Sequence, residues 1–241
     1  MNTFVKNNNL LISDKYQRTV VEYQSGIAAA AGVGGAADPT TQNWTYQGAS
    51  SGYSDSYDSG DGGWRIVDAT TFNPSLFFIQ TLSTDQIYDL INKDWSIHYN
   101  VALDKDAIQR DGTSVVDYYL APNNSRQNNM SIIIRVAGYF HYHITWYLDA
   151  SNQILIGNNN NISERYNTGY YLGGINPFPQ FLNGSAIYNK STNTLQLYLD
   201  NNYLGDVSLS GSTAENRVYI GASSSSGQGS AIWNSFALKS Y

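Results

Sequence analysis

Short runs of β-forming residues, separated by clusters of Asn, Gly and Ser, limit the folds open to this chain more than any other feature. Such a pattern is typical of proteins built from strands alone. Within Leu195–Leu199, Leu residues alternate with polar ones and so share one strand face. The sequence therefore predicts an all-β antiparallel sandwich of the jelly-roll type. Strands are expected at Gly63–Val67, Leu76–Gln80, Trp95–Leu103, Val115–Leu120, Ser131–Ala137, Tyr139–Leu148, Gln153–Ile156, Gly184–Asn189, Thr194–Leu199, Tyr203–Ser208, Arg217–Ala222 and Ser230–Lys239.

One helix interrupts this pattern. The segment of residues 82–92 begins with Ser and Thr, which cap helices. Ile87, Leu90 and Ile91 follow at the i, i+3, i+4 spacing of one helical face. We therefore expect a single helix there. Further along, Asp200–Tyr203 is predicted to form a tight hairpin connection between two strands.

Composition excludes several classes of protein. The net charge is -6 and Lys and Arg are few and scattered, so no surface for nucleic acid is expected. The chain has no Cys, which excludes disulfides and thiolate metal sites. No apolar stretch reaches the roughly 18 residues of a membrane span, and residues 1–17 lack the apolar core of a signal peptide. Tyr, Asn, Ser and Gly are abundant instead, as they are in binding loops.

Several segments resemble a known superfamily. They are Asp38-Pro-Thr-Thr-Gln-Asn-Trp44, Gly63-Trp-Arg-Ile-Val-Asp68, Leu197-Tyr-Leu-Asp-Asn-Asn-Tyr-Leu204, Val218-Tyr-Ile-Gly221 and Ala231-Ile-Trp-Asn-Ser-Phe-Ala-Leu238. Together they resemble the concanavalin A-like lectin/glucanase superfamily, and within it the sialic-acid-binding modules that precede bacterial sialidases. The resemblance implies a sandwich that binds carbohydrate. Those modules hold sialate with an Arg and a Glu. Arg135 has a suitable place on a strand, but none of the three Glu residues can be matched to it from the sequence.

The N-terminal region differs from the rest. Residues 1–37 are predicted to be a polar arm with a Gly- and Ala-rich hinge, and residues 38–241 to be the jelly-roll lectin-like domain. The arm should add little apolar area to the core. Its run Thr19–Tyr23 has β propensity, and we expect it to join the sheet edge of another chain. Residues 1–37 are thus the predicted anchor to an assembly, with a mobile terminus as the alternative.

Aromatic residues near predicted loops are the candidates for sugar binding, because a flat ring stacks on the C–H face of a sugar. For each ring, packing in the core or across strands is the alternative. Tyr170 and Tyr171 have the most loop-like surroundings. The candidate ligand-binding residues are Tyr53, Tyr57, Trp64, Arg135, Trp146, Tyr170 and Tyr171.

Metal and catalytic sites receive little support from the sequence. Asp55, Asp58 and Asp61 offer oxygen ligands for Ca²⁺ in a Gly-rich loop, although a solvated turn is favoured. His141 and His143 share one strand face, but no third metal ligand is evident. The paired carboxylates of glycanases are not recognisable. We therefore predict no catalytic residue and no cofactor, with glycoside hydrolysis as the least favoured function.

Two kinds of function agree with these features. A lectin-like domain behind a short arm, with no signal peptide and no Cys, is typical of a virion surface protein such as a head fibre or capsid decoration protein. We expect such a protein to be non-catalytic, to assemble in the host cytoplasm, and to bind glycans and other virion or capsid proteins. The resemblance implies a homotrimer. The alternative is an extracellular lectin or carbohydrate-binding module for cell adhesion, released by a non-classical route.

Overall fold

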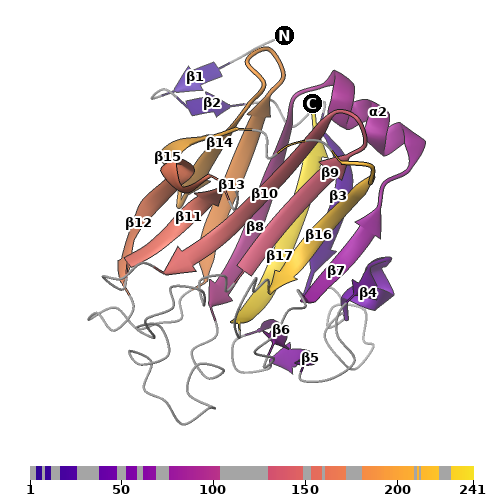
Figure 1. Ribbon diagram of the computed structural model, residues 1–241, viewed down its shortest axis with the longest axis vertical. Coiled ribbons are helices and arrows are strands. Elements are labelled where there is room, and N and C mark those ends of the chain that lie inside the picture. Colours follow the sequence, from indigo (N-terminus) through magenta and orange to yellow (C-terminus); the bar gives the residue numbers. More distant parts are fainter. Residues whose placement is uncertain are drawn as a thin grey trace.

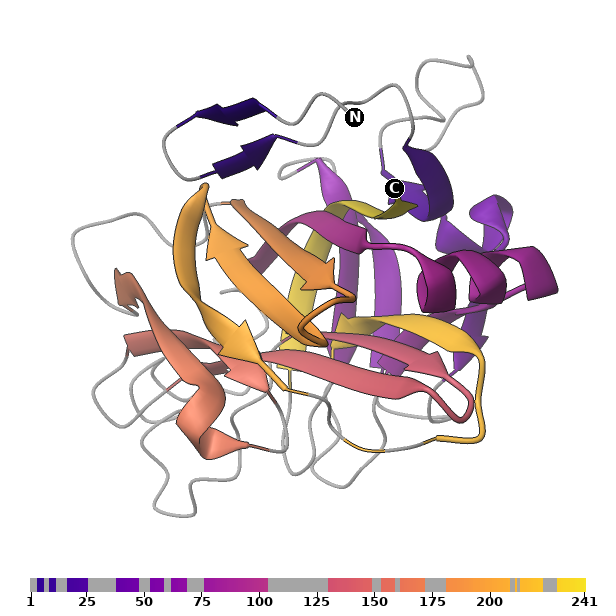
Figure 2. The ribbon, with the colours of Figure 1, turned by 90° about the horizontal axis from the view of Figure 1, so that it is seen from above.

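The computed structural model is a sandwich of two antiparallel β-sheets (Figures 1 and 2). It describes residues 4–6, 9–11, 17–25, 38–47, 53–58, 62–68, 76–103, 130–148, 153–158, 161–171, 181–208, 211, 213–222 and 229–241. One sheet has seven strands in the order β12-β11-β10-β9-β16-β7-β4. The other sheet has eight strands. Seven of them follow the order β15-β14-β13-β8-β17-β6-β5, and the eighth, β3, pairs with β17.

The strand and helix bounds are as follows. The seven-stranded sheet contains β4 (Thr45–Gln47), β7 (Leu76–Thr81), β9 (Met130–Val136), β10 (Phe140–Leu148), β11 (Gln153–Asn158), β12 (Arg165–Tyr171) and β16 (Arg217–Ala222). The eight-stranded sheet contains β3 (Arg18–Gln24), β5 (Tyr53–Asp58), β6 (Gly63–Asp68), β8 (Trp95–Leu103), β13 (Leu182–Asn189), β14 (Thr194–Leu199), β15 (Asn202–Val207) and β17 (Gly229–Ser240). The remaining elements are the pair β1 (Phe4–Lys6) and β2 (Asn9–Leu11), the helix α2 (Thr84–Asn92), and the 3₁₀ turns η2 (Pro39–Gln42) and η3 (Ile162–Glu164).

The core lies between the two sheets and follows the period of two along each strand. In β14, Leu195, Leu197 and Leu199 are buried while the residues between them are partly exposed. Burying an apolar side chain of this size stabilises the fold by about 1.5–3 kcal/mol. The predicted antiparallel sandwich is confirmed. The expected strand at Val115–Leu120 lies outside the described residues.

The predicted helix is also confirmed. Ser83 caps α2 through a capping box, in which its hydroxyl accepts from the Gln86 amide and the Gln86 side chain accepts from the Ser83 amide. Leu90 is fully buried against the sandwich. Within the described part of the chain, no helix has the length and apolar character needed to cross a membrane.

The N-terminal region contributes a strand to the sandwich. One edge of β17 is shared, because β6 pairs with its first half and β3 with its second half. Val21 and Tyr23 of β3 lie opposite Leu238 and Phe236 and are buried with them. The expectation that residues 1–37 add little to the core is therefore wrong for Arg18–Gln24. Val21 and Tyr23 alternate along β3, so both side chains face the core beside the apolar side chains of β17.

The outer edge of β3 is closed by side chains. Three of its carbonyl groups, at alternate positions, accept hydrogen bonds from residues of α2, of η2 and of the segment after η2. The pairs are Val20 O with Gln86 Nε2, Glu22 O with Trp44 Nε1 (3.0 Å), and Gln24 O with Gln42 Nε2 (2.9 Å). An edge whose carbonyls are already bonded is a poor template for another strand. β3 thus pairs within its own chain. This corrects the expectation that Thr19–Tyr23 joins the sheet edge of another chain.

Candidate functional site

Charged residues gather on the outward face of the seven-stranded sheet. The strand register places His141 of β10 opposite Arg135 of β9, and Arg135 opposite Arg217 of β16. Their neighbours Ile134 and Val136 are buried in the core. Because side chains alternate along a strand, the three charged or titratable side chains point away from the core.

Arg135 is the centre of this group. Its Nη1 donates to Glu215 Oε2 at 2.6 Å and to the Tyr219 hydroxyl at 3.4 Å. Its Nε donates to Nε2 of His141 at 3.4 Å, and its guanidinium lies 5.1 Å from the centroid of the Tyr219 ring. Tyr219 in turn donates to Glu215 Oε2 at 2.5 Å. We call Arg135, His141, Glu215, Arg217 and Tyr219 the Arg135 site.

The backbone holds Glu215 in place. The amide of Ala137 donates to Asn216 Oδ1 at 2.8 Å, and the amide of Gly138 donates to the Thr213 carbonyl at 3.1 Å. The amide of Glu215 itself donates to Thr213 Oγ1 at 3.2 Å. The segment that carries the carboxylate is therefore fastened to the β9–β10 hairpin. Such preorganisation lowers the cost of ordering the site when a ligand binds.

The Arg135 site carries a net positive charge. The hydrogen bonds from Tyr219 and Arg135 lower the pKa of Glu215, so its carboxylate is ionised near neutral pH. Burial, followed by the charge of Arg135, lowers the pKa of His141, so its imidazole is neutral there. Two guanidinium groups thus face one carboxylate. Both partners of the central pair reach solvent, since the side chains of Arg135 and Glu215 are 27% and 38% exposed.

A Ser–His pair lies one register step away on the same face. His143 Nε2 lies 3.2 Å from Ser131 Oγ, and Ser131 Oγ lies 3.0 Å from Thr145 Oγ1. Burial lowers the pKa of His143 to about 3. Ser131 and Thr145 are fully buried. His141 and His143 stack with centroids 6.3 Å apart, and no group of three or more metal-ligating residues occurs among the described ones.

Two predicted sugar-binding rings lie in the core. Trp64 and Trp146 are buried, so neither ring can meet a ligand from solvent. Trp64 shares its strand face with the buried Ile66, and Trp146 shares its strand face with the buried Ile144, which places both rings inside the sandwich. Their assignment as ligand-binding residues is corrected accordingly. Packing outweighed any loop-like appearance of the local sequence.

The predicted tyrosines have mixed positions. Tyr170 is half-buried against the core, and its hydroxyl donates to Asp200 Oδ2 at 2.8 Å. It links β12 to the β14–β15 turn and is therefore a packing residue. Tyr57 is exposed on β5. The side chains of Tyr53 and Tyr171 lie outside the described residues.

The predicted Asp-rich loop is in part a hairpin of β5 and β6. Asp55 accepts a hydrogen bond from Trp64 Nε1 at 3.0 Å, and Asp58 forms an ion pair with Arg65. Because they are three residues apart on one strand, Asp55 and Asp58 point to opposite faces. They do not converge on one cation, which corrects the Ca²⁺ hypothesis for this pair. Asp61 lies outside the described residues.

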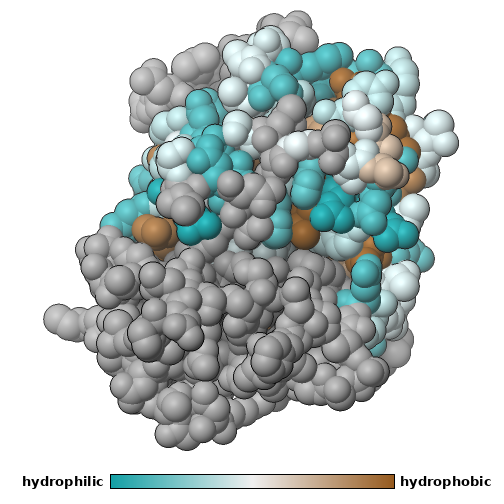
Figure 3. All heavy atoms as spheres, viewed as in Figure 1, coloured by the Kyte–Doolittle hydropathy of each residue, from teal (hydrophilic) through white to brown (hydrophobic). Residues whose placement is uncertain are grey.

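The sequence interpretation missed three members of the Arg135 site, namely Glu215, Arg217 and Tyr219. Glu215 and Tyr219 lie 80 and 84 residues from Arg135 along the chain. One signal was available, because Arg217 and Tyr219 alternate with Val218 and Ile220 and so must face outward. Figure 3 views the molecule from the seven-stranded side, and the described surface visible there is mainly hydrophilic with small, scattered apolar spots.

Comparisons with known proteins bear on the fold. No family model and no curated protein matches this sequence. A conserved carbohydrate esterase from the Shiga toxin-encoding bacteriophage phi24B superimposes with a TM-score of 0.62 at 10% identity, covering 93% of this chain and 99% of that chain. The binding domain of botulinum neurotoxin DC, in complex with rat synaptotagmin II, gives 0.52 at 10% identity. The alignment covers 91% of this chain and 47% of the neurotoxin chain. At 10% identity these likenesses show the fold alone, and they agree with the expected two-sheet antiparallel sandwich.

Proposed function

We propose that this chain is a non-catalytic glycan-binding protein whose Arg135 site takes an acidic saccharide. The observation that carries the proposal is the preorganised pair of Arg135 and Glu215, both of which reach solvent while the hydroxyl of the buried Tyr219 holds the carboxylate. A guanidinium presents a planar fork that matches a carboxylate or sulfate group. Glu215 can accept hydrogen bonds from sugar hydroxyl or amide groups, and the exposed ring of Tyr139 lies in the adjacent hairpin.

The virion-surface role is part of the same proposal. Its support is the likeness in fold to a bacteriophage protein over nearly the whole of both chains. That protein is named as a carbohydrate esterase, which favours carbohydrate as the class of ligand here too. We propose a head fibre or capsid decoration protein, present as a homotrimer, that reaches the particle surface after assembly in the host cytoplasm. Since β3 belongs to the sandwich, the proposed anchor is the part of residues 1–37 outside Arg18–Gln24.

Glycan binding by purified variants tests the site. Arg135→Ala should weaken binding to acidic glycans on an array by at least about tenfold, which corresponds to about 1.4 kcal/mol. Arg135→Lys should have an intermediate effect, because Lys keeps the charge but lacks the fork. Arg18→Ala is the matched control, since Arg18 is also an exposed Arg paired with a carboxylate. Equal binding by wild type and Arg135→Ala would remove the site from the proposal.

Particle composition tests the virion role separately. We expect mass spectrometry of purified particles to detect the chain, and antibodies against it to label their surface. Mass photometry of the purified protein should give three times the 26.7 kDa chain mass. A chain that is absent from particles but still binds glycans would favour the alternative, an extracellular adhesion lectin.

Hydrolysis is the second candidate, favoured by the Ser131–His143 contact and by the esterase of similar fold. Two features argue against it. The Ser131 hydroxyl is fully buried and shared with Thr145, so a substrate carbonyl could not approach it without a rearrangement. We therefore expect no release of acetate from acetylated saccharides. Acetate release that disappears in Ser131→Ala would establish an esterase.

A further inference from the structure

Two tyrosines face outward from the eight-stranded sheet, on the opposite side of the molecule from the Arg135 site. The register pairs Tyr198 of β14 directly with Tyr203 of β15. Their ring centroids are 5.5 Å apart with an angle of 60° between the planes. Leu197 and Leu199, on either side of Tyr198, are buried in the core, so the tyrosine pair points to solvent. Tyr203 is 54% exposed.

Both hydroxyl groups are held by neighbours on the same face. Tyr203 donates to Asp206 Oδ1 at 2.8 Å, and Tyr198 donates to Gln196 Oε1 at 3.3 Å. Gln196 and Asp206 are themselves a register pair. These four side chains form a compact group that we call the tyrosine patch. The rings are thus oriented in advance, while their faces remain available.

The strand that carries the patch is fastened to the other sheet. β15 is the edge strand of its sheet and β12 is the edge strand of the other. The Tyr166 hydroxyl of β12 donates to the Asp206 carbonyl at 2.5 Å. The Tyr166 ring also fills the space that a Cβ at Gly205 would need. Glu164 accepts from the Ser208 amide at 2.8 Å. The edge is therefore rigid enough to act as a fixed platform.

The outward face continues from the patch along one row of residues on neighbouring strands. Ser185 lies opposite the inner tyrosine of the patch, His98 lies opposite Ser185, and Ala237 lies opposite His98. In the next row, Asn100 donates to Asn183 at 2.8 Å. An extended ligand on the tyrosines can therefore cross the small side chain of Ser185 and reach His98 on the next strand.

We infer that the tyrosine patch is a second saccharide-binding site, for neutral saccharides. Aromatic rings supply rigid, amphipathic contact area, and they stack on the C–H faces of sugars. Gln196 and Asp206 supply acceptors for sugar hydroxyl groups beside the rings. The patch holds one carboxylate and no cation, so it disfavours the acidic saccharides proposed for the Arg135 site. Sites on opposite faces let one molecule bridge two glycans and gain avidity.

Binding of neutral hexasaccharides to the full chain tests this inference. The probes are hexasaccharides of β-1,4-linked glucose, β-1,4-linked N-acetylglucosamine and α-1,4-linked glucose, each titrated by isothermal calorimetry. We expect at least one to bind with a millimolar or lower dissociation constant. Tyr203→Ala should weaken that binding by about tenfold or more without changing the melting temperature, and Tyr203→Trp should retain it. Tyr88→Ala is the matched control, because Tyr88 is 64% exposed on α2.

Different substitutions should weaken binding at the Arg135 site and at the tyrosine patch. Arg135→Ala should leave binding of the neutral probes unchanged, and Tyr203→Ala should leave binding of acidic glycans unchanged. The inference is overturned if none of the three probes binds at millimolar concentration. It is also overturned if Tyr203→Ala and Tyr198→Ala both bind the probe as wild type does.

Discussion

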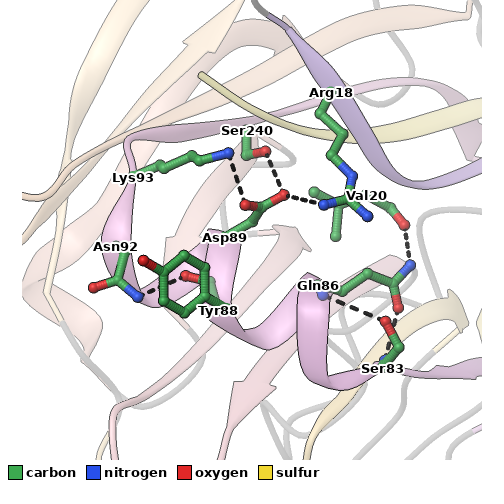
Figure 4. Close-up of polar contacts among 9 residues, drawn as sticks. All are labelled: Arg18, Val20, Ser83, Gln86, Tyr88, Asp89, Asn92, Lys93 and Ser240. Carbon is green, nitrogen blue, oxygen red and sulfur yellow. Dashed lines mark hydrogen bonds and ion pairs between the residues drawn. The ribbon is translucent and has the colours of Figure 1, made fainter.

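Among the described residues, two clusters in which a carboxylate pairs with more than one polar partner, including an arginine, differ in access to water. In the first, Asp89 Oδ2 accepts from Arg18 at 2.9 Å and from Ser240 at 3.4 Å, and Oδ1 pairs with Lys93 at 2.7 Å (Figure 4). We call this the Asp89 cluster. The Asp89 side chain is 5% exposed, against 38% for Glu215 in the Arg135 site. In both clusters the partners lower the pKa of the carboxyl group.

The difference lies in what each carboxylate joins. Asp89 connects α2, β3 and the end of β17, so its partners come from three elements that must be held together (Figure 4). Glu215 pairs with residues that already sit on one continuous sheet. A buried carboxylate that joins elements stabilises the fold, whereas an accessible one beside two arginines keeps bonding capacity for a ligand. Exposure, more than the pairing itself, separates a structural cluster from a binding site.

Removal of β3 should give the largest effect of any change considered. Deletion of residues 1–24 would take away Val20, Val21 and Tyr23 and break the Asp89 cluster. At about 1.5–3 kcal/mol for each buried side chain, the loss is about 5–9 kcal/mol, comparable to the whole stability of a domain. We expect no cooperative thermal transition by circular dichroism for this variant.

Deletion of residues 1–16 is the matched control for that experiment. It keeps β3 and Arg18, so it should melt as the full chain does. If the variant that lacks residues 1–24 melts cooperatively near the melting temperature of the full chain, then β3 is dispensable. The Asp89 cluster would then not be needed for the fold.

Asp89→Asn should have a smaller effect, about 2–3 kcal/mol at pH 7, because Arg18 and Lys93 can still reach water. Since the folded-state pKa of Asp89 is lowered, its stabilisation is present above the usual carboxyl pKa of about 4 and is lost as the pH falls through the lowered folded value. Urea unfolding should therefore show that the difference in unfolding free energy between wild type and variant is smaller at pH 3 than at pH 7.

Asp85→Asn, on the exposed side of the same helix, controls for a general change in α2. It should change the unfolding free energy by less than about 1 kcal/mol. If the difference in unfolding free energy between wild type and Asp89→Asn stays constant down to pH 3, then lost packing, and not lost charge, destabilises the variant.

The sequence predicted local features well and long-range pairing poorly. The bounds of β8, β14 and β16 follow directly from apolar alternation, and α2 from its cap and spacing. Alternation cannot say which strands are neighbours. For this reason the sequence predicts an anchoring arm where β3 lies, and it does not match Glu215 to Arg135. Trp64 and Trp146 show the same limit, because a ring beside polar residues can still face the core.

Glu215→Gln should give the smallest change in stability, about 1 kcal/mol or less, because partly exposed ion pairs contribute little to folding. Urea unfolding at pH 7, in parallel with Asp89→Asn, measures it. The substitution keeps the shape of the side chain and its bond from Tyr219 while removing the charge that faces Arg135. A loss as large as that of Asp89→Asn would place Glu215 among the structural groups. The accessible pairing of Arg135 and Glu215 would then no longer support a binding site, since both clusters would serve the fold.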